Sequence, residues 1–323
     1  MNSPQIEIGR TVTGKSIAVN LHSLQNTNII AGLKYTGKIQ LVKSILRQFV
    51  EKKIGCLVLD TEGLFTTPDS LGADWPVVIR PGVELRYPVD EIDTNTLLEI
   101  MKIIGLDDVA INVLFEKIQA IGEHITNIDK LRDAVREEPP LIRGQINRGL
   151  YFLERTKLTA DKEHLEAVKD LRKVIVNRLN EGRVLAVDFA GMTRTEMKIV
   201  FRLFMSDIRL SESGELKSLF LLIKEPHLYL SSTELEDFTL RTIRLGLWKF
   251  YITNTPQRLP ELIVRQADNL FCFYLGLQDD IKHLAPAARM STDAFQKMVS
   301  VLTSKEFLAT GQMVADGPLV LQV

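Results

Sequence analysis

The sequence predicts an α/β fold in which helices flank a mostly parallel central sheet. Seven short apolar runs are bounded by turn residues and lack polar alternation, as expected of strands covered on both faces. These runs are 28–33, 56–59, 77–80, 184–189, 219–223, 250–253 and 270–275. Helical patterns separate several of the runs, and strands that alternate with helices favour parallel pairing through crossover connections.

The stretch 93–181 departs from this alternation, because it has helical spacing throughout and no strand signal. Leu97, Met101 and Ile104 fall on one helical face, and 165–175 repeats the spacing. The stretch is too long for a single crossover connection. We therefore expect the first half of the core with N-terminal strands at 1–92, an all-helical insertion at 93–181, and the second half of the core at 182–323.

Composition excludes some functional classes. The chain is 45% hydrophobic and 25% charged with a formal net charge of −1, so contact with nucleic acid requires a local patch or pore loop. No apolar run approaches the ~20 residues that span a bilayer, and Met1–Pro4 has no signal-peptide pattern. Cys56 and Cys272 lie in apolar runs and are expected to be core thiols in a reducing compartment. These features predict a cytoplasmic protein.

Two segments have the pattern of a phosphate-binding loop. In such a loop glycines turn backbone N–H groups toward phosphates, a lysine reaches the terminal phosphates, and a Ser or Thr hydroxyl holds magnesium. Gly9–Ser16 matches G-x-x-x-x-G-K-[ST] in full, whereas Gly32–Ile39 has Ile39 in place of the hydroxyl residue. The loop works only between a buried strand and a helix whose N-terminus faces the phosphates.

Context favours the second segment. The run 28–31 reads as a buried strand leading into Gly32, and 39–50 has the spacing of an amphipathic helix. After Ser16 the apolar residues alternate, which is the period of a strand. We therefore predict a β-turn between two N-terminal strands at Gly9–Ser16. The residues predicted to bind nucleotide are Gly32, Thr36, Gly37, Lys38 and Ile39.

With this loop placed, six blocks in order resemble the HerA/FtsK family of P-loop ATPases, which are hexameric DNA-pumping motors, and HerA most of all. The blocks are 8–28, 56–63, 184–189, 219–227, 251–256 and 307–323. The N-terminal barrel usual in HerA proteins has no counterpart here. The resemblance implies a RecA-like fold, ATP or ADP as ligand, and a homo- or hetero-oligomeric ring, a hexamer in the family. It also implies duplex DNA in the pore and a nuclease or an active ATPase as partner.

Departures from the family pattern carry the functional prediction. Lys224 stands where the family has a magnesium-binding Asp, Ile39 replaces the loop hydroxyl, and Asn254 replaces the sensor Gln, whereas the catalytic Glu is retained as Glu225. Magnesium requires oxygen ligands and is repelled by an ammonium group. We therefore expect weak or absent magnesium binding. Lys224 is expected to pair with Glu225, with a bound phosphate or with Asp60.

Four further acidic or basic positions have two interpretations each. Arg241 and Arg244 precede the sensor strand, where the resemblance places residues that approach a neighbouring subunit's nucleotide; the alternative is an exposed helix face. Asp60, with Glu62, orients water or Lys38, or belongs to a solvated turn.

Asp188 also follows four apolar residues, so it is an alternative magnesium carboxylate or a turn cap.

Two functions of different class remain. Ile39 and Lys224 favour a non-hydrolysing scaffold or regulatory subunit of a DNA-translocation or DNA-processing assembly, with weak or absent ATP hydrolysis. Lys38, Glu225 and Arg244 favour the alternative, an active hexameric ATP-dependent DNA translocase or helicase motor.

Overall fold

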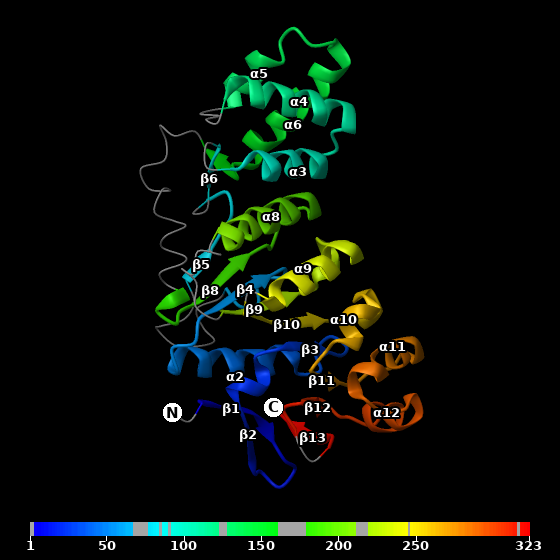
Figure 1. The fold of residues 1–323 in the computed structure, drawn as a ribbon. Helices are drawn as coiled ribbons and strands as arrows, with labels where there is room; N and C mark the ends of the chain where they lie inside the picture. The colour runs from blue at the N-terminus through cyan, green and yellow to red at the C-terminus, as the bar shows by residue number, and fades with distance from the viewer. Residues whose placement is uncertain are drawn as a thin grey trace. The chain divides into compact units, whose positions relative to one another are not determined.

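The computed structural model describes residues 3–66, 77–83, 86–89, 92–122, 128–160, 179–210, 219–244, 246–314 and 317–323 (Figure 1). It divides into two compact units. One consists of Met1–Val78, Arg178–Ala190 and Leu216–Val323, and the other of Ile79–Asn177 and Gly191–Glu215.

The first unit is built on an 11-stranded sheet with the order β2-β1-β13-β12-β11-β3-β10-β9-β4-β8-β5. The strands are β1 (Gln5–Arg10), β2 (Ser16–Asn20), β3 (Thr27–Ala31), β4 (Cys56–Asp60), β5 (Val77–Ile79), β8 (Val184–Asp188), β9 (Leu219–Lys224), β10 (Leu247–Thr253), β11 (Asn269–Phe273), β12 (Glu306–Gly311) and β13 (Leu319–Gln322). The central strands from β11 to β8 pair in parallel, and the strands from β12 to β2 pair antiparallel. The predicted α/β fold with a mostly parallel sheet is therefore confirmed.

Helices cover both faces of this sheet. They are α1 (Leu21–Leu24), α2 (Lys38–Glu51), α9 (Ser232–Arg244), α10 (Glu261–Arg265), α11 (Gln278–Ala288) and α12 (Thr292–Val299), with short 3-10 turns at Pro226–Leu228 and Pro256–Arg258. Phe250 of β10 packs in the same core cluster as α2. The next residue, Tyr251, forms a 2.6 Å hydrogen bond between its hydroxyl and that of Thr239 on α9. Because successive strand residues face opposite ways, α2 and α9 cover opposite faces.

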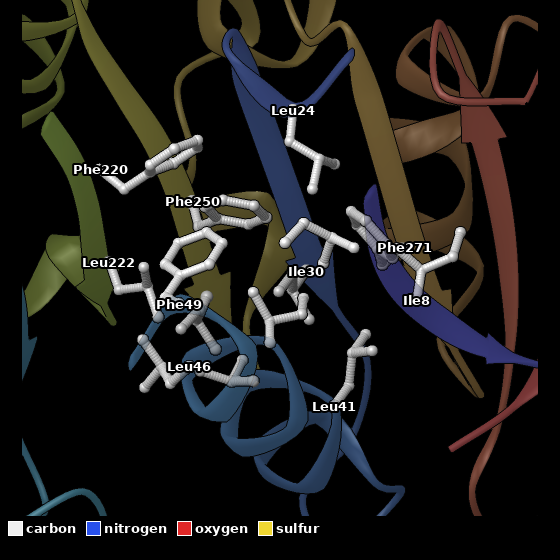
Figure 2. Close-up of a cluster of buried hydrophobic side chains, with 14 of the residues drawn as sticks. Ile8, Leu24, Ile30, Leu41, Leu46, Phe49, Phe220, Leu222, Phe250 and Phe271 are labelled. Carbon is white, nitrogen blue, oxygen red and sulfur yellow. The ribbon is translucent and has the colours of Figure 1, made fainter. Parts of the chain in front are cut away.

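The hydrophobic core between α2 and the sheet is built from apolar residues that recur along α2 with the period of a helix. Its buried residues include Leu41, Leu46 and Phe49, spaced so that they share one face. Figure 2 shows these side chains directed toward the strand residues that complete the cluster. The ring of Phe49 lies 4.7 Å from that of Phe220, centroid to centroid. This packing fixes the helix, and with it the loop that precedes the helix.

The N-terminal strands form a hairpin. β1 and β2 pair antiparallel, with Gly9 opposite Ile17 and Arg10 opposite Ser16. Gly14 has φ +82°, a left-handed conformation that glycine adopts without steric cost, and its N–H donates to Thr11 O over 2.8 Å. The segment Gly9–Ser16 therefore lies in a hairpin turn between two strands, as its alternating period predicted.

The second unit contains mainly helices. They are α3 (Thr94–Ile104), α4 (Asp108–Ile121), α5 (Ile128–Ala134), α6 (Pro140–Thr156) and α8 (Arg194–Leu210). Asp93 and Asp107 cap α3 and α4 by accepting backbone N–H groups, and α6 begins at Pro140, where the missing N–H costs nothing. The predicted helical run 165–175 lies outside the described residues. In the described part of the chain no helix is long and apolar enough to cross a membrane.

Two features of this unit were not indicated by the sequence. A short strand, β7 (Thr159–Ala160), pairs in parallel with β6 (Tyr87–Pro88). Helix α8 belongs to this unit although it lies within 182–323, and an ion pair of 3.1 Å joins Arg202 Nε on α8 to Glu99 Oε2 on α3. Apolar periodicity identifies both helices but carries no information about which neighbours they contact.

Candidate nucleotide-binding site

The loop Gly32–Ile39 connects a central strand to a buried helix. β3 ends at Ala31 between the parallel neighbours β10 and β11, and α2 begins at Lys38. A Cβ on Gly32 would lie 2.6 Å from the Cβ of Phe273, and the φ of Gly32 is +150°. Gly37 has φ +116° and a similar lack of space beside Lys305. Both ends of the loop therefore require glycine.

Lys38 is folded into this loop. Its Nζ donates to Gly32 O over 2.6 Å and to Leu33 O over 2.5 Å, and the residue is only 4% exposed. Burial lowers the pKa of Lys38 to about 8, although the Glu225 carboxylate offsets part of that shift. The Thr36 hydroxyl also bonds to Leu33 O, over 2.7 Å. A phosphate bound here has to compete with two carbonyl oxygens for the ammonium group.

A cavity of about 400 Å³ opens beside the loop. Its lining comes from the loop, from the turn after β4 and from the carboxyl ends of β9 and β10, namely Lys34, Tyr35, Gly37, Lys38, Ile39, Gln40, Glu62, Leu64, Lys224, Glu225, Ile252 and Asn254. This edge of a parallel sheet is where ligands bind in open α/β folds. The structure thus gathers most of the residues predicted to bind nucleotide, together with Glu225 and Asn254, around one cavity.

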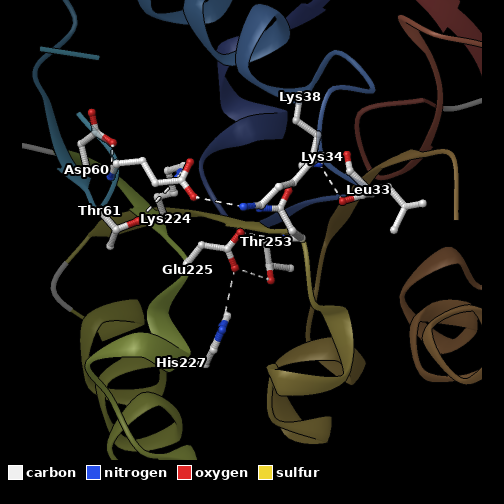
Figure 3. Close-up of polar contacts among 12 residues, drawn as sticks. Leu33, Lys34, Lys38, Asp60, Thr61, Lys224, Glu225, His227 and Thr253 are labelled. Atoms are coloured by element: carbon white, nitrogen blue, oxygen red, sulfur yellow. Dashed lines mark hydrogen bonds and ion pairs between the residues drawn. The ribbon is translucent and has the colours of Figure 1, made fainter. Parts of the chain in front are cut away.

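Lys224 is the last residue of β9 and is 2% exposed. Its Nζ lies 2.7 Å from Glu62 Oε2 and 3.5 Å from Thr61 Oγ1, as Figure 3 illustrates for Thr61. Glu62 Oε1 is also 4.0 Å from Lys34 Nζ. The ion-pair partner of Lys224 is therefore Glu62, and the expected pairing with Glu225 or Asp60 is corrected. The reason is that β4 and β9 are adjacent, so the turn after β4 faces the end of β9.

The Asp60 carboxylate is bonded to backbone N–H groups of the turn that follows it, and it does not line the cavity. Its buried carboxylate accepts the N–H of Phe65 over 2.7 Å and that of Glu62 over 3.2 Å. Burial raises the pKa of Asp60, and these hydrogen bonds oppose the shift. Asp188, opposite Asp60 on β8, accepts the N–H of Ala190 over 2.9 Å. Both carboxylates cap turns at strand ends, and Asp60 thereby positions the backbone of Glu62.

Glu225 directly follows β9, and its side chain is held by the end of the neighbouring strand β10. Its carboxylate accepts the Thr253 hydroxyl over 3.0 Å and the N–H of Asn254 over 2.8 Å, and His227 Nδ1 lies 3.6 Å away (Figure 3). Burial raises the pKa of Glu225, while the hydrogen bonds lower it. Glu225 adopts φ +45°, which turns its side chain out of the strand direction. A carboxylate so placed can accept a proton from a water molecule in the cavity.

The two arginines lie on α9, outside the residues that line the cavity. Arg241 is exposed. Arg244 ends the helix, and its side chain lies outside the described part of the chain. Their predicted role toward a neighbouring subunit stays a prediction.

The residues do not fit a conventional magnesium site. Ile39 lines the cavity without an oxygen atom, and Lys224 brings a buried ammonium to the strand end. Among the described residues no group of three His, Cys, Asp or Glu side chains is arranged to hold a metal ion. Magnesium takes octahedral oxygen coordination, and both carboxylates of this lining are already bonded, Glu62 to Lys224 and Glu225 to Thr253 and Asn254. The cavity is better suited to anions, since three lysines and two glutamates line it.

Solved structures of similar fold identify the architecture. VirB4 of Thermoanaerobacter pseudethanolicus is 12% identical, with a TM-score of 0.71, and the match covers 100% of this chain and 97% of that chain. The bacterial conjugative coupling protein TrwB is 12% identical, with a TM-score of 0.62, over 98% of this chain and 88% of that chain. TrwB has also been solved with a non-hydrolysable ATP analogue, and that structure gives the same TM-score over 99% of this chain and 90% of that chain. No protein-family model and no curated protein sequence matches the chain.

Proposed function

We propose that this chain is a nucleotide-binding subunit of a ring-shaped DNA-translocation or DNA-processing assembly in the cytoplasm. The proposal starts from its fold, which is the RecA-like fold of the HerA/FtsK-type P-loop ATPases. In this proposal it hydrolyses ATP very slowly or not at all and serves as a scaffold or regulatory subunit. Its partners would be further copies of itself or an active ATPase, with a nuclease as another candidate.

The observation that carries the proposal is the buried Lys224 ammonium in the cavity beside Lys38. In P-loop ATPases magnesium bridges the terminal phosphates and neutralises the charge that develops during transfer. By the family resemblance, a fixed positive charge and the apolar Ile39 side chain replace its protein ligands here. Loss of the ion removes electrostatic stabilisation from the transition state and leaves the phosphate-binding backbone intact.

Nucleotide binding is supported by the parts that remain. The loop keeps both glycines in conformations that other residues avoid, and Lys38 stays within reach of the phosphates at the N-terminus of α2. The ATP analogue in TrwB supports ATP or ADP as the ligand. A ligand that is bound without being consumed would stabilise the fold or a subunit interface by mass action.

Ring formation and contact with DNA are proposed from the fold alone. The mass of the purified chain in solution, with and without ATP, tests the ring, because a strict monomer under all conditions fits neither a homo-hexamer nor a motor. Gel mobility of duplex DNA over a salt series tests the contact with DNA, and no binding at low ionic strength would contradict it.

An active translocase is the second candidate, and Glu225 favours it. This carboxylate faces the cavity and is held by Thr253 and Asn254, as a general base must be. Turnover separates the two candidates. We expect no magnesium-dependent ATP hydrolysis above that of the Lys38→Ala variant. Hydrolysis that requires magnesium and disappears in Lys38→Ala would establish the active motor instead.

A further inference from the structure

We infer that Lys34 and Lys224 form an anion subsite next to the phosphate loop, that this subsite takes a metal-free phosphate group, and that the Glu62 carboxylate fills it until the phosphate arrives. The inference rests on the proposed function only in that nucleotide enters this cavity. It adds that the bound phosphate carries no magnesium and that the Glu62 carboxylate competes with this phosphate for the two lysines.

Lys224 cannot leave the cavity wall. It is 2% exposed and sits at the end of a central strand with neighbours on both sides. A buried ammonium needs acceptors, because charge without a partner is costly to remove from water. An ammonium has three donors, and in the described part of the chain its contacts are Glu62 Oε2 and the longer one to Thr61. Whatever moves during binding, the positive charge stays in place.

Glu62, in contrast, is free to turn outward. Its side chain is 40% exposed, and the backbone is fixed by the hydrogen bond from its N–H to Asp60. The Lys34 side chain, 4.0 Å away, is 65% exposed. Rotation of Glu62 into solvent therefore breaks its ion pair with Lys224, and the incoming phosphate must supply the acceptor that the ammonium loses. Phosphate oxygens accept the same charge-assisted hydrogen bonds as the carboxylate and can take its place.

The charges select a ligand without magnesium. Lys34, Lys38 and Lys224 face Glu62 and Glu225, so the lining carries a net charge of +1 when these groups have their usual charges. When Glu62 leaves, the lining becomes more positive at the point where it contacts the ligand. A metal-free polyphosphate is more negative than its magnesium complex and gains more from these lysines. The Lys224 ammonium thus supplies the neutralising charge that magnesium supplies elsewhere.

The test measures binding of ATP to the full chain by calorimetry in excess EDTA, with inorganic tripolyphosphate as competitor. We expect Glu62→Gln to tighten binding by about three- to tenfold, because the amide keeps the shape and loses the charge that competes. Glu62→Asp, which shortens the carboxylate, should change affinity in the same direction. Glu261→Gln, which removes an exposed carboxylate paired 2.6 Å from Arg265 on α10, is the matched control and should leave affinity unchanged.

The outcomes separate this inference from the proposed function. Wild-type affinity in both Glu62 variants would overturn the competitor role, although nucleotide binding as such would stand. ATP that tripolyphosphate fails to displace would overturn the phosphate assignment. An absence of ATP binding in the wild type and in every Glu62 variant, with EDTA or with magnesium, would overturn both. Tighter binding in Glu62→Gln, with displacement by tripolyphosphate, supports the inference.

Discussion

Replacement of Lys224 by methionine should abolish or reverse the preference of the cavity for metal-free over magnesium-bound ATP. Methionine keeps the length of the side chain and removes its charge. Removing one partner of a buried ion pair is costly when the other partner stays buried and charged, and Lys224 itself is only 2% exposed. Glu62, which is 40% exposed, can be hydrated once its partner is gone. We therefore expect the variant to fold with little change in Tm.

The magnitude follows from Coulomb's law. A divalent ion about 4 Å from the Lys224 ammonium is repelled by about 8 kcal/mol at an effective dielectric constant of 20, and by about 2 kcal/mol in bulk water. The cavity is open to water, since the Lys34 and Glu62 side chains on its wall are 65% and 40% exposed, and water screens part of the higher figure. We therefore adopt the lower figure, which corresponds to a preference of about 30-fold for metal-free ATP.

The assay compares the Kd of ATP in EDTA with that in excess magnesium, for the wild type and for Lys224→Met. The wild type should bind metal-free ATP more tightly, and the variant should lose that preference or reverse it. Glu261→Gln serves as the control, since both side chains of its ion pair are exposed. The reasoning is refuted if the wild type binds magnesium ATP as tightly as metal-free ATP, or if Lys224→Met leaves the ratio unchanged.

Three further changes test the loop and the core beneath it. The pKa of Lys38 is lowered to about 8, so the lysine loses its charge as pH rises, and ATP affinity should fall about tenfold between pH 7 and pH 9. The Lys38→Arg variant stays charged and should show a weaker dependence on pH. A wild-type affinity that does not change with pH would contradict the assignment. Gly32→Ala places a Cβ 2.6 Å from that of Phe273 and should abolish ATP binding in calorimetry, whereas Gly14→Ala, in the open hairpin turn, should bind normally. Phe49→Ala should lower the free energy of unfolding in urea by about 3–5 kcal/mol, because the ring packs within a filled cluster; a loss below 1 kcal/mol would mean that the α2 packing is not as described.

Much of the fold was predictable because buried parallel strands leave a clear signal. Uninterrupted apolar runs such as 219–223 became central strands, and the strand, loop and helix around Gly32 and Lys38 followed from local period alone. The order of strands in the sheet was not predictable in the same way. It depends on which apolar faces fit together across long stretches of sequence, and apolar content does not encode that choice.

The candidate site shows the same division. The residues of the loop could be named from sequence because they follow a buried strand at a recognisable spacing, and Glu225 could be named from the family resemblance. The partner of Lys224 could not, because Glu62 reaches it only through the pairing of β4 with β9. Had that adjacency been known, the polar turn that follows Asp60 would have been the first place to look for an acidic partner.

The N-terminal hairpin has a practical consequence for anyone who designs an inactive variant. Lys15 belongs to the segment that satisfies the phosphate-loop consensus in full, and it is exposed beside a tight turn between two antiparallel strands. No helix begins there to direct N–H groups at an anion. A Lys15→Ala knockout chosen by consensus would behave like the unaltered protein, and its normal phenotype would be misread as proof that nucleotide is dispensable.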